Sequence, residues 1–409
     1  MPLRYGKAVN GPLNKPSYVT LIKVKSSCNS VEVTGTATKA AERHHLVFLF
    51  VGGALAAVAA VALGVAVVLH MYKRRRRCSY NYTRSPRSRK GSLGPTEEIS
   101  PQLFSYDQLR RATDGFKEEL GRGSFGAVYK GAIGGNGETR RLVAVKRLEK
   151  VIEEGEREFL TEMRSIGRTH HRNLVRLLGV CHEGQTRLLV YEYMSNGSLA
   201  SFIFKKVDDD RPRLRWNERV RIAVDVARGI LYLHQDCEPH IIHCDIKPQN
   251  ILMDASRTAK ICDFGLAKLL GPDQTRTFTA VRGTRGYLAP EWYKNAPISV
   301  KADVYSFGMV LLETICCRKN LDVDVPDEEM ILSEWVYRCF REGQLSKLLK
   351  EEEEDGEEVE KRVLERMVKV ALWCIQEEPA LRPTMKMVMA MLEGNLETPI
   401  PPPPDSRES

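Results

Sequence analysis

The 409-residue chain lacks the features that stabilise small extracellular modules and zinc-binding domains. It contains 10 cysteines, but their spacing matches no zinc-ligand pattern. Only Cys28 lies in the first 45 residues, so this segment cannot close an internal disulfide. The segment is also too short to bury a hydrophobic core of its own. A disulfide-rich module and a zinc site are therefore excluded, and the other nine cysteines are expected to be reduced.

No apolar run precedes residue 46, so the sequence predicts no cleavable signal peptide. Residues 46–69 contain no Asp, Glu, Lys or Arg. A helix over this segment, rising about 1.5 Å per residue, is long enough to cross a hydrocarbon layer of about 30 Å. The alternative is a buried core helix, which would not need to be apolar on all sides. We therefore expect a single transmembrane helix over residues 46–70.

Positive charge is concentrated at one end of the chain. Residues 1–100 contain 16 Lys and Arg against 4 Asp and Glu, whereas the whole chain contains 62 against 53. The remainder therefore holds 46 basic and 49 acidic side chains, so nucleic acid is not an expected partner.

Five consecutive cations at residues 73–77 follow the apolar segment. The positive-inside rule places them in the cytoplasm, which makes residues 1–45 an extracellular stub and residues 71–113 a basic linker beside the membrane. The cations should also attract anionic lipid headgroups. Cys78 is either a plain thiol or a palmitoylation site.

One octapeptide carries most of the chemistry. Residues 243–250 read His-Cys-Asp-Ile-Lys-Pro-Gln-Asn, and Asp263-Phe264-Gly265 follows thirteen residues after Asn250. The order presents a candidate base, Asp245, a cation, Lys247, and two candidate magnesium ligands, Asn250 and Asp263. Groups of this kind deprotonate a hydroxyl and hold magnesium on nucleotide phosphates.

A glycine-rich segment lies upstream of these residues. Its glycines allow backbone N–H groups to approach phosphate oxygens that a Cβ would obstruct. The segment continues into strand-like sequence rather than a helix, which favours a β-hairpin over a nucleotide rather than a dinucleotide fold. The expected nucleotide contacts are Gly121, Arg122, Gly123, Ser124, Phe125, Gly126 and Val128.

A second strand, residues 143–146, ends at Lys146, which we expect to bind the α- and β-phosphates. This amine needs an anion to fix its position. Helical periodicity over residues 153–168 places Glu162 on the next element, sixteen residues after Lys146. Glu162 is the expected partner, with Glu156 and Glu158 as alternatives.

Taken together, these motifs resemble the protein kinase family over residues 104–396. The resemblance is to plant receptor-like Ser/Thr kinases of the G-type lectin S-receptor-like group, on residues 104–116, 243–250 and 371–376. It implies an α+β, bilobal protein kinase fold with a five-stranded N-lobe sheet and a helical C-lobe. The expected organisation is a kinase domain over residues 114–396, preceded by the transmembrane helix, and an extended, disordered proline-rich tail over residues 397–409.

The resemblance also implies roles for individual residues. ATP would lie between the lobes, with Mg²⁺, or Mn²⁺ as an alternative, on Asn250 and Asp263. Asp245 would accept the hydroxyl proton, and Lys247 would neutralise charge on the γ-phosphoryl group. The remaining ATP-binding positions are Ala144, the gatekeeper Tyr191, the hinge Glu192, Tyr193 and Met194, and Leu252.

Further positions concern the activation segment and its supports. Thr275, Thr277 and Thr279 are candidate phosphorylation sites, and Thr284 agrees with Ser/Thr specificity. Asp303 would bind the catalytic-loop backbone, and Glu291 would pair with Arg382. The sequence departs from the family pattern at Cys244, because arginine usually precedes the catalytic aspartate; this places the chain in the non-RD group.

The resulting hypothesis is a single-pass plasma-membrane kinase that phosphorylates Ser/Thr hydroxyls of protein substrates, in plant defence or stress signalling. The alternatives are a pseudokinase and a membrane scaffold that binds ATP without turnover. A homodimer or a co-receptor kinase is the expected activating partner. The family carries lectin modules outside the membrane, so the short stub predicts either a truncated product or an incomplete gene model.

Overall fold

The computed structural model describes Gly64 and residues 101–403, except residues 124–125, 135–139, 150–151, 168, 205–213, 272, 295 and 350–359. Apart from Gly64, the expected transmembrane segment lies outside these residues, as do the extracellular stub and residues 71–100 of the linker. Within the described ranges, no helix combines the length and apolar character that a membrane crossing requires.

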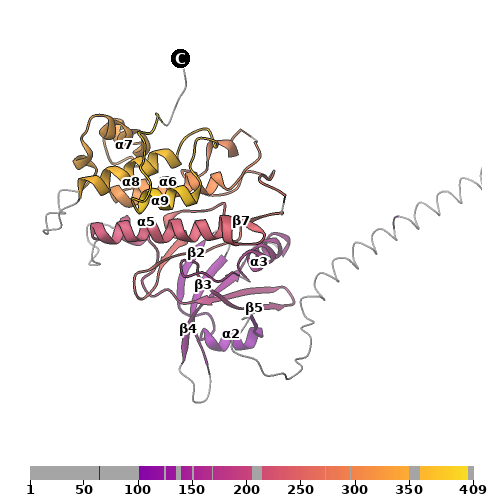
Figure 1. The fold of residues 1–409 in the computed structure, drawn as a ribbon. Helices are drawn as coiled ribbons and strands as arrows, with labels where there is room; N and C mark the ends of the chain where they lie inside the picture. Colours follow the sequence, from indigo (N-terminus) through magenta and orange to yellow (C-terminus); the bar gives the residue numbers. More distant parts are fainter. Residues whose placement is uncertain are drawn as a thin grey trace, which may run out of the picture. The chain divides into compact units, whose positions relative to one another are not determined.

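The bilobal α+β architecture expected from the sequence is confirmed (Figure 1). The N-lobe is built on one sheet with strand order β1-β5-β6-β4-β3-β2. Its strands are β1 (Gln102–Leu103), β2 (Glu119–Gly123), β3 (Gly126–Ile133), β4 (Arg141–Leu148), β5 (Leu177–Glu183) and β6 (Thr186–Glu192).

The expectation of five strands was therefore wrong, because the described part of the sheet has six. The extra strand, β1, comes from the linker and pairs in parallel with β5. Its parallel register joins Gln102 to Gly179 and Leu103 to Val180. The other neighbouring strands are antiparallel.

Two helices cover opposite faces of this sheet. The helix α2 (Tyr106–Ala112) begins with a capping box between Ser105 and Gln108, and it buries Leu109 completely against one face. The helix α3 (Ile152–Ile166) buries Phe159 and Ile166 on the other side. Strand residues alternate between the faces, as a period of two requires. Full burial of one leucine contributes about 1.5–3 kcal/mol to such packing.

Helices dominate the C-lobe (Figure 1). They are α4 (Ala200–Ile203), α5 (Trp216–Leu231), α6 (Lys301–Cys316), α7 (Leu332–Arg341), α8 (Lys361–Cys374) and α9 (Met385–Leu392). Shorter turns are the π-helical η1 (Tyr232–Asp236) and the 3₁₀ helices η2 (Pro248–Asn250), η3 (Pro290–Trp292), η4 (Asp327–Glu329) and η5 (Leu345–Leu348). The helix α6 is buried along almost its whole length and forms the centre of the lobe.

Two pairs of short strands carry the catalytic motifs at the edge of the C-lobe. They are β7 (His240–Ile242) with β10 (Lys268–Leu270), and β8 (Ile251–Met253) with β9 (Ala259–Ile261). Both pairs are antiparallel.

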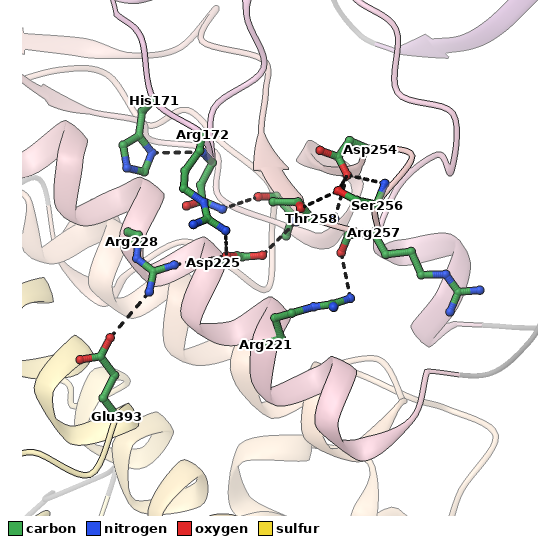
Figure 2. A network of polar contacts seen from close by, with 12 residues as sticks. His171, Arg172, Arg221, Asp225, Arg228, Asp254, Ser256, Arg257, Thr258 and Glu393 are labelled. Atoms are coloured by element: carbon green, nitrogen blue, oxygen red, sulfur yellow. Dashed lines mark hydrogen bonds and ion pairs between the residues drawn. The ribbon is translucent and has the colours of Figure 1, made fainter.

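A network of polar contacts joins α5 and neighbouring segments to β9 (Figure 2). The buried carboxylate of Asp225, on α5, accepts a hydrogen bond from the Ala259 N–H at 3.3 Å. The same carboxylate lies 3.4 Å from the guanidinium of Arg228 and 3.9 Å from that of Arg172. Asn173 donates its amide to the Ala259 carbonyl at 3.0 Å. The strand leading to the Asp-Phe-Gly motif is thereby held by both α5 and the segment that follows α3.

Candidate active site

Lys146 is the centre of a buried charged cluster between the lobes. Its Nζ lies 2.8 Å from Oε2 of Glu162 on α3 and 2.7 Å from Oδ1 of Asp263 after β9. Burial alone would lower the pKa of Lys146, but the two carboxylates outweigh this effect and raise it. Burial would raise the pKa of Asp263, and Lys146 reverses the direction and lowers it. The Lys146 ammonium and the Asp263 carboxylate are therefore both charged at neutral pH.

Glu162 is the partner that the structure selects among the three glutamates considered. Glu156 instead contacts Arg187 and His182. The second oxygen of Glu162 accepts a hydrogen bond from the Tyr191 hydroxyl at 2.5 Å. This contact ties the candidate gatekeeper to α3 and was not foreseen. Burial raises the pKa of Tyr191 well above its usual value, so the phenol stays a hydrogen-bond donor.

Asp245 lies at the end of a short polar chain in the C-lobe. Its Oδ1 accepts a hydrogen bond from Thr284 Oγ1 at 2.7 Å, and its Oδ2 lies 2.8 Å from Lys247 Nζ. Lys247 Nζ also donates to Thr284 Oγ1 at 2.8 Å. Asn250 donates its amide to Oδ2 and to the main-chain carbonyl of Asp245, each at 2.9 Å. The four residues form one cluster, and the amide oxygen of Asn250 is left free of these contacts.

Asp303, the buried aspartate near the start of α6, holds the backbone of the catalytic loop through hydrogen bonds. Its two carboxylate oxygens accept hydrogen bonds from the N–H groups of His243 and Cys244, at 2.8 and 2.9 Å. Its Oδ2 also lies 2.8 Å from Nε2 of His234. Burial would raise the pKa of Asp303, but the hydrogen bond with His234 and the electrostatic effects of His234 and His243 lower it. An ionised Asp303 can therefore hold the strained loop, in which Cys244 has a left-handed φ of 68°.

The side chain of Cys244 lies in an apolar pocket. The pocket is formed by Ile242, Leu266, Leu270, Ala289, Trp292, Ile298 and Ala302. The thiol donates a weak hydrogen bond to the Ile242 carbonyl at 3.6 Å. Burial raises its pKa well above the usual value, so Cys244 behaves as a small hydrophobic residue and is unsuited to act as a nucleophile.

Arg382 and Glu291 form a buried, bidentate pair behind the activation segment. Both guanidinium NH groups lie 2.8 Å from the Glu291 oxygens. Arg382 also donates Nε to the carbonyl of Gln376 at 2.7 Å and NH1 to that of Lys301 at 2.9 Å. The pair therefore links η3 to the start of α6 and to the segment after α8.

Glu313 is a buried residue that the sequence reading missed. Its carboxylate accepts hydrogen bonds from the Tyr287 hydroxyl at 2.9 and 3.0 Å and from the Asn320 N–H at 2.8 Å. Burial raises its pKa to about 8. Its position within the apolar second half of α6 was the signal that could have revealed it.

The predicted nucleotide contacts of the glycine-rich segment lie at the junction of β2 and β3. Ser124 and Phe125 fall outside the described residues. Arg122 pairs instead with Glu119 and Glu149. The glycines 121, 123 and 126 lie where β2 meets β3, with Gly123 opposite Gly126. Gly126 cannot be replaced without strain, because its φ is 132° and a Cβ would meet the Arg147 carbonyl at 2.0 Å.

The hinge positions end β6. Glu192 is held by Lys260, at 3.0 Å, and by the N–H of Arg176. Tyr193 is half-buried, and Met194 is buried. The remaining predicted contacts, Val128, Ala144 and Leu252, are half-buried on β3, β4 and β8.

The candidate phosphorylation sites differ in exposure. Thr275 is exposed, and Thr279 is half-buried. Thr277 is also half-buried, and its backbone exchanges two hydrogen bonds with Ile298. None of these threonines shares the contacts that join Thr284 to the catalytic loop.

The sequence profile of the family described as "Protein kinase domain" matches residues 115–392. The chain belongs to the protein kinase family. A G-type lectin S-receptor-like serine/threonine-protein kinase LECRK3 of Oryza sativa subsp. indica is 53% identical over 309 residues, covering 75% of this chain and 37% of the relative. A similar kinase of Arabidopsis thaliana, RLK1, is 47% identical over 337 residues, covering 80% of this chain and 39% of the relative. These relatives confirm the expected subgroup, and the matched domain is a Ser/Thr protein kinase domain.

A third relative, LECRK1 of Oryza sativa subsp. japonica, is 52% identical over 310 residues, which cover 76% of this chain and 37% of the relative. The chain thus spans less than two fifths of the length of these relatives.

Proposed function

We propose that this kinase is active and transfers the γ-phosphate of ATP to Ser/Thr hydroxyls of proteins. The observation that supports this most strongly is the position of Lys146, which contacts both Glu162 and Asp263. An N-lobe cation, a helix carboxylate and the Asp-Phe-Gly aspartate must all be in place for phosphoryl transfer. Here they meet within one hydrogen-bonded cluster.

The residues present fit ATP with a divalent cation. Asp263 offers a carboxylate and Asn250 an amide oxygen, which are ligand types that Mg²⁺ takes together with waters and phosphates. No group of three or more His, Cys, Asp or Glu within the described residues forms a metal site made of protein ligands alone. The bound metal would neutralise phosphate charge, and Lys146 would orient the α- and β-phosphates.

Asp245 is the proposed base. Its Oδ1 lies beside Thr284 and its Oδ2 beside Lys247, so one cation and one hydroxyl fix the carboxylate. Asp245 would orient the attacking hydroxyl and accept its proton, and Lys247 would stabilise the charge on the transferred group. Rate enhancement then comes from positioning and electrostatics.

The test uses the purified full chain, ATP with magnesium, and two otherwise identical peptides that carry either serine or tyrosine. We expect phosphorylation of the serine peptide and loss of turnover in Asp245→Asn. ATP binding without turnover by the unaltered chain would instead favour the pseudokinase or scaffold. Equal rates on both peptides would contradict Ser/Thr specificity.

We further propose that the chain is anchored in the plasma membrane through residues 46–69, with the kinase domain in the cytoplasm. The uncharged segment and the cations at 73–77 support this orientation. The relatives' names include the word receptor, and we extend to this chain a role in signalling with a second copy or a co-receptor kinase. Protease added to intact cells should spare the kinase domain until the cells are permeabilised. Digestion of that domain in sealed cells would refute the proposed orientation.

A further inference from the structure

The last described residues make specific contacts with the C-lobe. Residues 397–403 have no regular secondary structure, as expected, but they are not free of the domain. Trp373 on α8 donates its Nε1–H to the Pro399 carbonyl at 3.0 Å. Gln376, just after α8, donates its side-chain amide to the Pro402 carbonyl at 3.2 Å. Both contacts join the first part of the expected disordered tail to the end of α8.

These contacts repeat with a period of three residues. The accepting carbonyls belong to positions 399 and 402. The buried residues are Thr398, which is 9% exposed, and Pro401, whereas Ile400 between them is 76% exposed. A polyproline II helix has three residues per turn, so one side of it presents every third residue. Proline favours this conformation because its ring fixes φ.

Contacts within the C-lobe hold Gln376 in place independently of the tail. The Gln376 side chain is buried and also donates to the Leu372 carbonyl at 2.9 Å. The main-chain carbonyl of Gln376 accepts a hydrogen bond from Arg382. Trp373 supplies an aromatic ring together with an N–H donor. Such a surface suits proline, which has no N–H and can offer only its carbonyl.

We propose that Trp373 and Gln376 form a binding site for a proline-rich extended peptide, and that its ligand is the chain's own tail, residues 398–403, bound in cis. An aromatic side chain combined with hydrogen-bond donors to proline carbonyls is a general means of recognising polyproline II segments. The site is distant in sequence from Asp245 and requires no kinase activity. The tail and the site are separable, so the same peptide supplied free binds when the tail is removed.

The experiment measures the fluorescence anisotropy of a labelled peptide of residues 396–404. The peptide should bind a chain that ends at Leu396 with a Kd on the order of 100 µM. It should bind the unaltered full chain at least about tenfold more weakly, because the tethered tail competes at an effective concentration near the millimolar range.

Matched substitutions in the shortened chain identify the site. Trp373→Phe keeps a ring but loses the donor, and it should weaken binding about fivefold, as should Gln376→Leu. Trp335→Phe, on α7, is the control and should leave binding unchanged. Equal affinity of the wild-type and Trp373→Phe chains would overturn the assignment.

A second variant keeps the proposal testable if the shortened chain does not fold. In the full chain, Pro401→Glu places a charge at the buried tail position and should release the tail, so the free wild-type peptide should then bind. Folding is checked by the melting temperature. No binding up to about 5 mM peptide by a folded variant overturns the proposal. Equal affinity for the unaltered and altered chains overturns the cis assignment.

Discussion

The surroundings of Lys146 and Cys244 differ in charge: the first are ionic and the second are hydrophobic. Around Lys146, one ammonium is balanced by two carboxylates within 2.8 Å. Around the Cys244 side chain, the packed residues are apolar, and the thiol is neutral. Both regions support the segment between Asp263 and Glu291. The difference indicates that the charged groups proposed for phosphoryl transfer are present in this chain. The position that carries an arginine in many kinases is instead occupied by a neutral side chain, which needs no counter-ion.

The largest effect is expected from removing charge at the Lys146 cluster. Lys146→Ala and Asp263→Asn should each lower ATP-dependent peptide phosphorylation by ~100-fold or more, about 2.7 kcal/mol on the barrier. The phosphates lose their cation in the first variant, and the metal loses a carboxylate in the second.

Steady-state kinetics on the purified full chain measure these losses. Lys130→Ala is the matched control, because Lys130 also lies in the sheet and pairs with a glutamate, Glu118, but on the surface. Its activity should be unchanged. Rates within about threefold of wild type for Lys146→Ala or Asp263→Asn would rule out the proposed mechanism.

The second largest effect is expected from the buried pair of Arg382 and Glu291, which lies next to Trp292 of the hydrophobic cluster around Cys244. Arg382→Ala leaves Glu291 buried and unpaired, which should lower the free energy of unfolding by roughly 3–5 kcal/mol. Lys294→Ala breaks the exposed pair with Glu377 and should cost less than about 1 kcal/mol.

Denaturant unfolding of the full chain distinguishes these cases. The double variant Arg382→Met with Glu291→Met removes both charges and should lose less stability than Arg382→Ala alone. A loss below about 1 kcal/mol for Arg382→Ala would show that the pair does not support the activation segment.

Glu313 provides a pH-dependent comparison. Its folded pKa is raised to about 8, above its ordinary value of 4.5, because the carboxyl is buried. Its stabilising contribution is thus fully present below pH 4.5 and is lost as pH rises to about 8. Between pH 5 and 8, wild type should lose roughly 3–4 kcal/mol more unfolding free energy than Glu313→Gln. Parallel pH curves for the two proteins would contradict this.

The sequence predicted residues whose positions depend on local spacing. Asp245, Asn250 and Asp263 belong to one loop and hairpin, so their order along the chain nearly determines their proximity. The position of Glu162 could be predicted from helical periodicity and from one long-range pairing, with Lys146.

The remaining features depend on surfaces that are distant in sequence. The capping box at Ser105 and Gln108 indicates a helix, but the burial of Leu109 depends on strands some 35–80 residues away. A proline-rich tail indicates irregular structure, but not the donors Trp373 and Gln376 that hold it. The sequence likewise shows that Cys244 replaces an arginine, but not that apolar side chains fill the pocket.

The smallest effect should come from the candidate phosphorylation sites. In a kinase with arginine before the catalytic aspartate, the guanidinium binds a phosphorylated activation-segment residue. Cys244 cannot make that contact, because it is a neutral thiol packed in a hydrophobic cluster. Replacing Thr275, Thr277 and Thr279 by alanine should therefore change peptide phosphorylation by less than about fivefold, roughly 1 kcal/mol on the barrier.

Thr284→Ala is the matched control, since Thr284 alone among these threonines contacts Asp245 and Lys247. Its loss should exceed that of the triple variant by tenfold or more, about 1.4 kcal/mol. Among the cations of the segment, Lys268, Arg276 or Arg282 would have to replace the missing arginine. A hundredfold loss in the triple variant, restored when one threonine is returned and phosphorylated, would show that such a cation acts. The segment would then be a phosphorylation switch despite the apolar pocket around Cys244.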